Sequence, residues 1–171
     1  MILLVTRDII EQNEPGAYNV LSEPELMGHG GASGPHTRYT NFKVPADRLL
    51  CARGDATATV IETAFGITAA LVGALACGTM RTVFESALKF VKEDHRGGSV
   101  PIIQRQSVAD LLIDCKIKID ISRLMVRNAL DSIDRGRGDT ASRLESCLQA
   151  KIYSGEAAVQ AIWEAMQAVG M

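Results

Sequence analysis

The chain has 171 residues, 47% of them apolar, and its 18 lysines and arginines nearly balance 20 acidic residues, for a formal net charge of −2. This balance excludes a basic nucleic-acid-binding domain and an acidic tail protein, and the apolar fraction is sufficient for a hydrophobic core. The length suits one domain, or one domain with part of a second.

The N-terminal third is predicted to form short strands joined by turns. Residues 2–6 are a short apolar run typical of a buried strand, and residues 18–21 predict another. Alternating side chains over residues 39–44 indicate a third strand. Residues 44–50 then lead the chain out of this sheet toward a linker at Gly54.

Residues 28–34 read Gly-His-Gly-Gly-Ala-Ser-Gly and have the composition of a dinucleotide-binding glycine loop. That motif requires a strong strand before it and a helix after it, and neither is predicted here, so the glycines are interpreted as turn formers. His29 and His36 have no third ligand and no helical spacing. We therefore expect loop histidines and no metal site.

Three long helices are predicted over residues 58–94, 103–134 and 140–169. Apolar residues recur in each at spacings of three and four, which is typical of an antiparallel bundle. The predicted apolar stripes are, helix by helix, Val60, Ala64, Ile67, Leu71, Ala74 and Leu75; Val108, Leu111, Leu112, Cys115, Ile119, Ser122, Val126, Ala129 and Ile133; and Leu144, Leu148, Ile152, Gly155, Val159, Ile162, Met166 and Val169.

The first helix is uncharged from residue 63 to residue 80, which raises the question of a membrane span. Its richness in alanine, glycine and threonine favours a tightly packed helix of a bundle instead. Gly66, Gly73 and Gly78 are costly in a helix and are expected where another backbone approaches closely. Three such helices leave a broad apolar face, which a fourth helix or a partner subunit should cover.

The connection between the first two helices, residues 95–106, is the candidate binding segment. A Gly-Gly pair ends the first helix, and Pro101 cannot continue a helix interior. Arg96, Arg105 and Gln106 are therefore expected near one end of a helical hairpin. Two guanidinium groups and an amide at such a junction suit an anionic ligand.

The residues by themselves define no reaction, because no Ser/His/Asp order, metal-ligand spacing or P-loop is present. Thr68 is either a core threonine bonded to its own helix or a site hydroxyl. Asp94, Asp110 and Asp114 are interpreted as solvated helix-surface carboxylates. The four cysteines contain no C-x-x-C pair, and we expect reduced thiols in a non-oxidising compartment: Cys51, Cys77, Cys115 and Cys147.

Several segments resemble, in chain order, the acyl-CoA dehydrogenase superfamily and, within it, the nitroalkane oxidase branch. They are residues 33–38, 62–65, 69–73, 96–99, 106–110, 112–117, 151–153 and 168–171. The resemblance implies an α+β, mostly α, fold. In it, residues 1–54 are the remnant of a middle β domain and residues 55–171 are an incomplete C-terminal helical bundle domain without its last helix. On this resemblance the chain is expected to be an internal piece of a longer protein.

The resemblance implies FAD as cofactor and a homotetramer in which a neighbouring subunit supplies part of each FAD site. Arg96 matches the arginine that contacts the FAD diphosphate across that interface, and Gln106 matches a glutamine near the cofactor. Gln167 and Gly170 match the family's Gln-x-x-Gly cofactor stretch. Arg105 stands where a histidine is expected in related sequences, although its charge still suits a phosphate.

The resemblance also implies a reaction, in which a nitroalkane and O2 give an aldehyde or ketone, nitrite and hydrogen peroxide. An aspartate removes the substrate proton in that branch, and it is expected beyond Met171, so the chain alone is predicted to be inactive. Thr68 falls where the branch has a serine that supports this aspartate. Phe65 falls where a phenylalanine lines the substrate channel.

Two other functions are left open. An acyl-CoA dehydrogenase-type parent would act on acyl thioesters with a glutamate base, and a non-enzymatic helical module would serve oligomerisation. The expected partners are FAD, a small-molecule substrate and further copies of the chain, without nucleic acid or membrane. The expected location is intracellular: cytoplasmic, with mitochondrial or peroxisomal targeting left open because the N-terminus of the parent would be missing.

Overall fold

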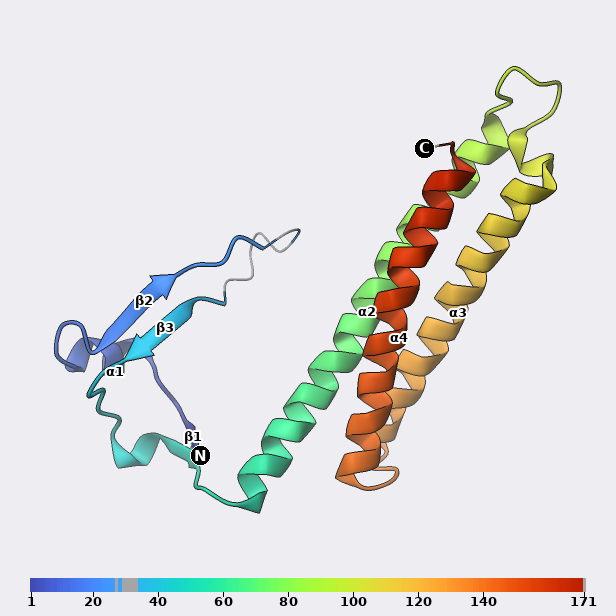
Figure 1. The fold of residues 1–171 in the computed structure, drawn as a ribbon. Helices are drawn as coiled ribbons and strands as arrows, with labels where there is room; N and C mark the ends of the chain where they lie inside the picture. Colours follow the sequence, from blue (N-terminus) through green and yellow to red (C-terminus); the bar gives the residue numbers. More distant parts are fainter. Residues whose placement is uncertain (27, 29–33, 171) are drawn as a thin grey trace. The chain divides into compact units, whose positions relative to one another are not determined.

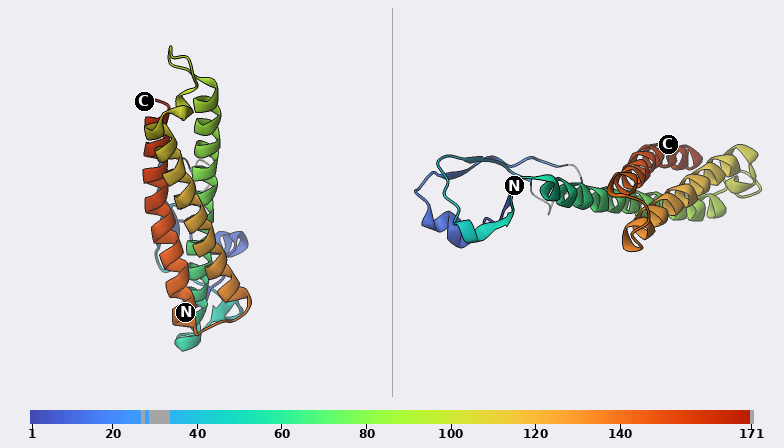
Figure 2. Two further views of the ribbon diagram at one scale, coloured as in Figure 1. Left: turned by 90° about the vertical axis from the view of Figure 1, so that its right-hand side faces the viewer. Right: turned by 90° about the horizontal axis from the view of Figure 1, so that it is seen from below.

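The computed structural model describes residues 1–26, 28 and 34–170. The chain divides into two compact units, Met1–Ala58 and Thr59–Met171, and each has its own arrangement of elements (Figures 1 and 2). The glycine-loop interpretation for residues 28–34 and the role of His29 lie almost wholly outside the residues that the structure describes. His36 is described and exposed.

The first unit consists of short strands, a short helix and a 3-10 turn. Its elements are β1 (Ile2–Leu3), α1 (Arg7–Gln12), β2 (Tyr18–Ser22), β3 (His36–Tyr39), the 3-10 turn Ala46–Arg48 and β4 (Leu49–Cys51). β1 pairs antiparallel with β4, and β2 pairs antiparallel with β3, giving two separate two-stranded sheets. The predicted strand at residues 18–21 is confirmed by β2. The buried strand predicted over residues 2–6 is confirmed only in part, because β1 covers Ile2–Leu3 alone and Leu3 is exposed. α1 was not predicted from the sequence.

The predicted strand over residues 39–44 is wrong, because β3 ends at Tyr39. Asn41 adopts φ 51°, a left-handed conformation that asparagine tolerates and that no strand can contain. The Asn13 side chain then binds both backbone groups of Lys43, donating to its carbonyl at 2.9 Å and accepting from its N–H at 2.7 Å. These side-chain bonds replace the strand ladder that the alternation predicted.

The second unit is an antiparallel three-helix bundle made of α2 (Asp55–Glu93), α3 (Gln106–Asp134) and α4 (Thr140–Ala168). The three predicted helices are confirmed. α3 begins three residues later than predicted, because Ile102–Gln104 forms a separate 3-10 turn and Arg105 is extended, with ψ 122°. Asp139 caps α4 by accepting a hydrogen bond from the Ser142 N–H at 2.8 Å.

The predicted apolar stripe of α3 is the one that packs inside the bundle. Its buried residues are Leu112, Cys115, Ile119, Ser122, Val126, Ala129 and Ser132. α4 differs, because its buried face is made of small residues: Cys147, Ala150, Ser154, Ala157, Ala161, Ala165 and Ala168. On α2 the face against its neighbours is also mostly small: Gly66, Ala69, Ala70, Gly73, Cys77, Met80, Ala87 and Val91.

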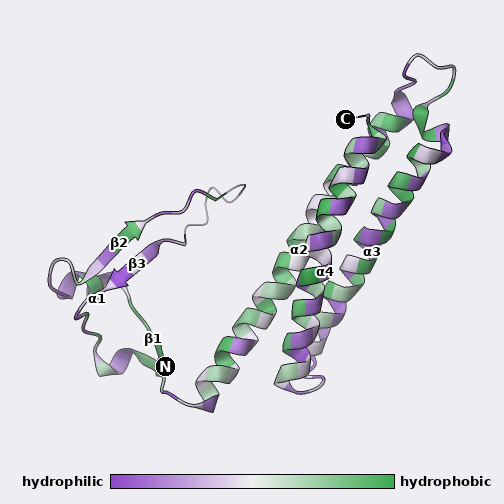
Figure 3. Ribbon diagram, in the orientation of Figure 1, coloured by the Kyte–Doolittle hydropathy of each residue, from purple (hydrophilic) through white to green (hydrophobic). Residues whose placement is uncertain are grey.

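The large apolar residues predicted as stripes of α2 and α4 are therefore mostly exposed. Leu75 is 63% exposed on α2, and Val159 is 71% exposed on α4. Figure 3 shows hydrophobic residues along much of α2, interrupted by polar residues toward its C-terminal end. The prediction that these stripes form the packing faces of α2 and α4 is wrong for contacts within the chain, because the neighbouring faces of small side chains pack there.

Two of the three glycines of α2 mark close approach of another helix, as predicted. A Cβ on Gly73 would lie 3.0 Å from Val126 Cγ2 and 3.2 Å from the Ala150 carbonyl oxygen. A Cβ on Gly66 would lie 3.5 Å from Leu144 Cδ1. Gly78 has nothing within 4 Å of such an atom, so the prediction fails there for contacts within the chain.

One ion pair joins α3 to α4 on a partly buried surface. Lys118 Nζ lies 2.7 Å from both carboxylate oxygens of Glu164, and the two side chains are 17% and 20% exposed. The Cys115 thiol lies 3.7 Å from the same carboxylate and 3.1 Å from the Ala161 carbonyl. Burial, with the charge of Glu164, raises the pKa of Cys115 to about 11. All four cysteines are free thiols, three of them buried.

α2 is long and apolar enough to cross a membrane by length and composition alone. Its most apolar 18-residue window has a mean hydropathy of 1.9, and 22% of that window is buried inside the bundle. A core helix of a soluble protein meets the same criteria, so this property is weak evidence by itself.

Candidate functional site

Arg96 joins the α2–α3 connection to the C-terminal end of α4. Its Nε lies 2.7 Å from Asp94 Oδ2, and its Nη2 donates to the Val169 carbonyl. A Cβ on Gly170 would lie 3.2 Å from Nη2, and Gly170 has φ 82°, a left-handed conformation that favours glycine. The structure thus brings together two of the predicted site residues, Arg96 and Gly170, from segments more than seventy residues apart.

The backbone at Arg96 is left-handed, with φ 45°, a conformation that is uncommon outside glycine. The Arg96 N–H donates to Asp94 Oδ1 at 3.0 Å, so one carboxylate holds both the backbone and the side chain. This N–H, and to a smaller extent the charge of the guanidinium, lowers the pKa of Asp94 below its ordinary value of 3.8. Asp94, interpreted from the sequence as a solvated carboxylate, is instead the residue that orients Arg96.

The guanidinium retains binding capacity after these contacts. Its Nε and one N–H of Nη2 are engaged, and 47% of the side chain is exposed. Its central carbon lies 5.4 Å from the centroid of the Phe90 ring, a cation–π distance. An arginine held from one side by a carboxylate, a carbonyl and a ring presents its remaining N–H groups to a ligand.

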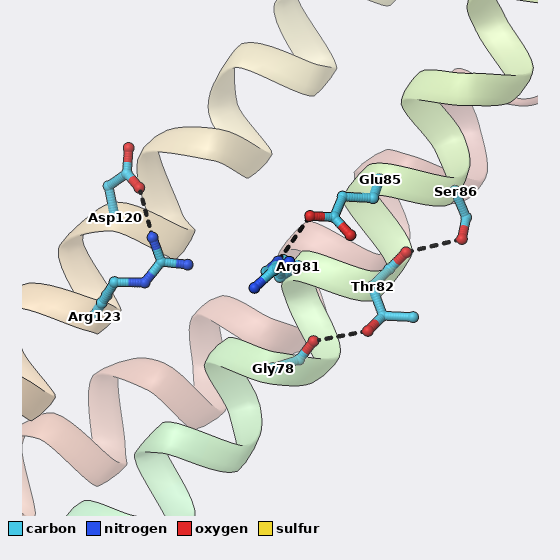
Figure 4. A network of polar contacts seen from close by, with 7 residues as sticks. All are labelled: Gly78, Arg81, Thr82, Glu85, Ser86, Asp120 and Arg123. Atoms are coloured by element: carbon cyan, nitrogen blue, oxygen red, sulfur yellow. Dashed lines mark hydrogen bonds and ion pairs between the residues drawn. The ribbon is translucent and has the colours of Figure 1, made fainter.

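A hollow of about 510 Å³ lies beside Arg96 between the C-terminal parts of α2 and α4. It is lined by Thr82, Val83, Ser86, Ala87, Phe90, Arg96, Ala165, Met166, Val169 and Gly170. Figure 4 shows that the two hydroxyls of this lining bond to their own helix, Thr82 to the Gly78 carbonyl and Ser86 to the Thr82 carbonyl. The hollow is therefore largely apolar, with a positive charge at one end.

The other predicted cofactor residues lie near this end of the bundle without joining Arg96 directly. Arg105 is the N-terminal flanking residue of α3, and its Nη2 lies 3.9 Å from where a Gly98 Cβ would be. Gln106 donates to Asp110 at 2.6 Å. The Gln167 side chain is exposed, and the backbone carbonyl of Gln167 accepts from the Gly170 N–H at 3.0 Å.

Thr68 and Phe65 lie elsewhere, on the outer face of α2. The Thr68 hydroxyl donates to the carbonyls of Ala64 and Phe65, at 2.9 and 3.0 Å, and the Phe65 ring is 66% exposed. Thr68 is therefore bonded to its own helix, but it is not a core residue. Twenty-five residues of helix separate it from the end of α2, which is roughly 40 Å at 1.5 Å per residue.

Sequence reasoning missed the partners that hold Arg96: Asp94, Phe90 and the Val169 carbonyl. Asp94 and Phe90 are close in sequence, and an Asp-x-Arg order at a helix end could have indicated the first pairing. The Val169 contact depends on tertiary structure alone. Among residues that the structure describes, no group of three or more His, Cys, Asp or Glu side chains could hold a metal ion.

Residues 58–171 match the model of the acyl-CoA dehydrogenase C-terminal domain. The chain therefore belongs to the acyl-CoA dehydrogenase family, and the predicted fold class is confirmed by this match and by the helical bundle.

Among individual proteins the chain resembles nitroalkane oxidase. It is 51% identical over 170 residues to the enzyme of Fusarium oxysporum, covering 99% of this chain and 39% of that protein. It is 44% identical over 171 residues to the Podospora anserina enzyme, covering 100% and 40%. A nitroalkane oxidase active-site mutant crystallized with 1-nitrooctane superimposes with a TM-score of 0.94 at 51% identity, covering 99% and 39%. The chain thus spans about two fifths of the length of these relatives. A further matching structure, at 51% identity, is described as the flavoprotein nitroalkane oxidase.

Proposed function

We propose that this chain forms the C-terminal helical part of an FAD-dependent oxidoreductase that resembles nitroalkane oxidase. The parent reaction converts a nitroalkane and O2 to an aldehyde or ketone, nitrite and hydrogen peroxide. FAD, when bound, takes two electrons from the substrate and passes them to O2. The similarity over almost the whole chain supports this class, and the anchored, half-exposed Arg96 is the observation that carries the cofactor assignment.

The surroundings of Arg96 fit part of an FAD molecule. A guanidinium with free N–H groups suits a diphosphate, which accepts paired hydrogen bonds. The adjacent hollow is walled by Phe90, Met166 and other apolar side chains, which suits a flat ring. Arg105 is a second cation on the same connection, and Gln106 and Gln167 are exposed amides near it. These residues would bind and orient the cofactor.

Thr68 and Phe65 are proposed to serve the substrate side of the site. Phe65 projects from α2 as an exposed ring that can line an apolar channel. Thr68 holds its hydroxyl hydrogen in a bond to its own helix, so it must rotate before it can donate to a carboxylate. None of the described residues is proposed as the base that removes the substrate proton.

The distance between Thr68 and Arg96 along α2 supports a homo-oligomer. We expect the homotetramer that the family resemblance implies. Thr68 and Arg96 are roughly 40 Å apart on one bundle at 1.5 Å per helical residue. A single FAD molecule cannot span that distance. If both residues serve one FAD site, they must come from different copies of the chain. The exposed apolar stripe of α2, including Leu71 and Leu75, provides a surface for such an association.

The test is an FAD titration of the purified chain, followed by flavin fluorescence. Arg96→Ala is expected to weaken binding by about ten- to a hundred-fold, because it removes hydrogen bonds to a charged group. Arg135→Ala is the matched control, since Arg135 is an exposed arginine paired with Asp131 at the opposite end of the bundle. Equal affinity of wild type and Arg96→Ala would contradict the cofactor assignment.

A second candidate is a non-enzymatic oligomerisation module, which the exposed apolar residues of α2 and α4 favour. A folded, oligomeric chain that binds no FAD would support the module over the flavoprotein. Release of nitrite from nitroethane at enzyme-like rates, with FAD added, would contradict the expectation that the chain alone is inactive. Oxidation of an acyl-CoA under the same conditions would instead support the thioester alternative.

A further inference from the structure

α3 carries a second row of apolar side chains on the side opposite its buried seam. The row is aligned along the helix, because its members recur at spacings of four, four and three residues. We refer to these four residues as the outer stripe: Ile113, Ile117, Ile121 and Leu124. All four are between 39% and 66% exposed. Single apolar residues on a surface are ordinary, but an aligned and exposed row indicates a contact with another molecule.

The two ends of the outer stripe carry opposite charges. Asp110 and Asp114 lie toward its N-terminal end, and Arg123 and Arg127 lie toward its C-terminal end. Arg123 is paired with Asp120 on the same helix, at 3.8 Å (Figure 4). Within the described part of the chain, neither Asp110 nor Arg127 forms an ion pair, and Asp110 accepts one hydrogen bond from its own helix. An unpaired negative charge at one end and an unpaired positive charge at the other are therefore available to a partner.

A second copy of α3, running in the opposite direction, fits this arrangement. In an antiparallel helix pair related by a twofold axis, residues that are equally far from a common midpoint lie opposite each other. Ile113 and Leu124 have their midpoint between residues 118 and 119. Asp110 and Arg127 have the same midpoint. The arrangement that sets apolar residues against apolar residues therefore also sets each carboxylate against a guanidinium.

We propose that the outer stripe of α3 is a self-association seam in which two copies of the chain pair antiparallel. Asp110 of each copy lies opposite Arg127 of the other, and the isoleucines at positions 117 and 121 meet near the twofold axis. A parallel pair is disfavoured, because it would set each charge against its own copy, and like charges repel. The proposal rests on the homo-oligomer of the proposed function, to which it adds a surface and an orientation, and it does not depend on FAD.

The seam is short, which limits its strength. Asp110 and Arg127 are separated by roughly 25 Å of helix at 1.5 Å per residue. One helix pair of this length is small beside the interfaces of tight complexes, so association through the seam is expected to be weak and concentration-dependent. Charge pairs at its ends set the orientation of the two copies and exclude mismatched partners.

The first measurement is sedimentation equilibrium of the full chain over a range of concentrations. Arg127→Asp is expected to weaken association about tenfold, because each pair of copies loses two attractions and gains two repulsions. Asp110→Arg should weaken it to a similar extent. The double variant restores both pairs with reversed sign and should return the dissociation constant to within about threefold of wild type.

A matched variant separates the seam from net charge. Arg127→Asp combined with Glu11→Arg has the wild-type net charge, but Glu11 belongs to α1 and cannot restore the pair across α3. This variant should associate as weakly as Arg127→Asp alone. Equal rescue by Glu11→Arg and by Asp110→Arg, or a wild-type chain that stays monomeric, would overturn the proposal. FAD titrations of the same variants are independent of these results, so failure of the seam is distinguishable from failure of the cofactor assignment.

The orientation is tested by cysteines placed on the outer stripe. On mild oxidation, a mixture of Ile113→Cys and Leu124→Cys chains should form linked dimers faster than either variant alone, because these positions face each other across the antiparallel pair. Both positions are exposed, so the substitutions leave the core intact. Wild type, with its four native thiols, gives the background rate. Faster linking of each variant with itself would show a parallel pair and overturn the proposal.

Discussion

α3 and α2 belong to the same bundle but differ in the side chains that they bury. α3 buries Leu112, Ile119 and Val126 in its seam beside smaller residues, and its outer face mixes charges with exposed apolar residues such as Leu124. α2 buries glycine, alanine and cysteine along most of its length and exposes leucines, valines and a phenylalanine. The small face lets the α2 backbone come close to its neighbours, as the contacts of Gly73 show. Most of the large apolar side chains of α2 stay exposed and can contact a partner outside this chain.

The difference shows that an apolar stripe on a helix does not identify the surface it packs against. A helix with two apolar faces can pack through the smaller one and keep the larger one for another partner. On α2 the large face carries Phe65 and Leu75, and the small face carries Gly66 and Gly73. The following predictions test this division, beginning with the largest effect.

Truncation in the α3 seam and on the outer face of α2 should have different consequences. Ile119→Ala is expected to cost about 3 kcal/mol of unfolding free energy, because it leaves a cavity in the core. Leu75→Ala removes an exposed side chain and should change monomer stability by less than about 0.5 kcal/mol. Denaturant titration measures both. Sedimentation velocity should show weaker self-association only for Leu75→Ala, and an equal loss of stability in both variants would break the comparison.

Enlargement of the glycines should distinguish the two faces of α2 in the same way. Gly73→Leu is expected to destabilise by about 2–3 kcal/mol, because its Cβ meets Val126 and the Ala150 carbonyl. Gly78→Ala has open space and should gain up to about 1 kcal/mol from helix propensity. Thermal unfolding monitored by circular dichroism provides both values. A destabilised Gly78→Ala would place another backbone against that residue, as in an oligomer.

The ion pair between α3 and α4 should contribute more than an exposed pair on the same helix. Lys118→Met leaves Glu164 partly buried without its partner and is expected to cost about 2 kcal/mol. Lys116→Met is the control, because its pair with Asp120 is about half exposed and should contribute less than about 0.5 kcal/mol. Urea titrations of the two variants compare them directly, and equal costs would contradict the burial argument.

The smallest expected effect concerns the carboxylate that holds Arg96. Because the folded-state pKa of Asp94 is lowered, its contribution to stability is present above the unfolded pKa and is lost as pH falls through the folded value. The stability difference between wild type and Asp94→Asn should be constant from about pH 5 to 8 and shrink below about pH 4. Denaturation curves across this range measure it. A difference that grows toward acid pH would show that Asp94 is not ionised against Arg96.

Much of the fold could be predicted from the sequence. The three helices followed from apolar periodicity, and the α2–α3 connection followed from Gly97, Gly98 and Pro101. The first unit was less predictable, because its short elements depend on side-chain contacts such as that between Asn13 and Lys43. The side-chain alternation of a strand only a few residues long is a weak signal, and one such side-chain contact can change which residues form the strand.

The candidate site was predicted in part. Arg96 and Gly170 were singled out as cofactor residues, and the structure places them in contact. Asp94 was assigned to the solvent surface, although its position two residues before Arg96 could have indicated the pair. The left-handed conformation of Arg96, which brings its N–H to the carboxylate, is seen only in the structure. The sequence left open whether Thr68 is a core residue or a site residue. Only the structure shows that it is exposed and bonded to its own helix.

By itself the sequence determined where the helices lie, because helix periodicity and helix-breaking glycines and prolines act over a few residues. The matching segments of sequence also indicated which family the chain resembles. Only the tertiary structure decided which faces of α2 and α4 are buried and which residues hold Arg96. These outcomes depend on how closely backbones approach and on contacts such as that between Arg96 and Val169, whose residues are far apart in the sequence. Packing of this kind is a property of the assembled helices, and no single stretch of sequence contains it.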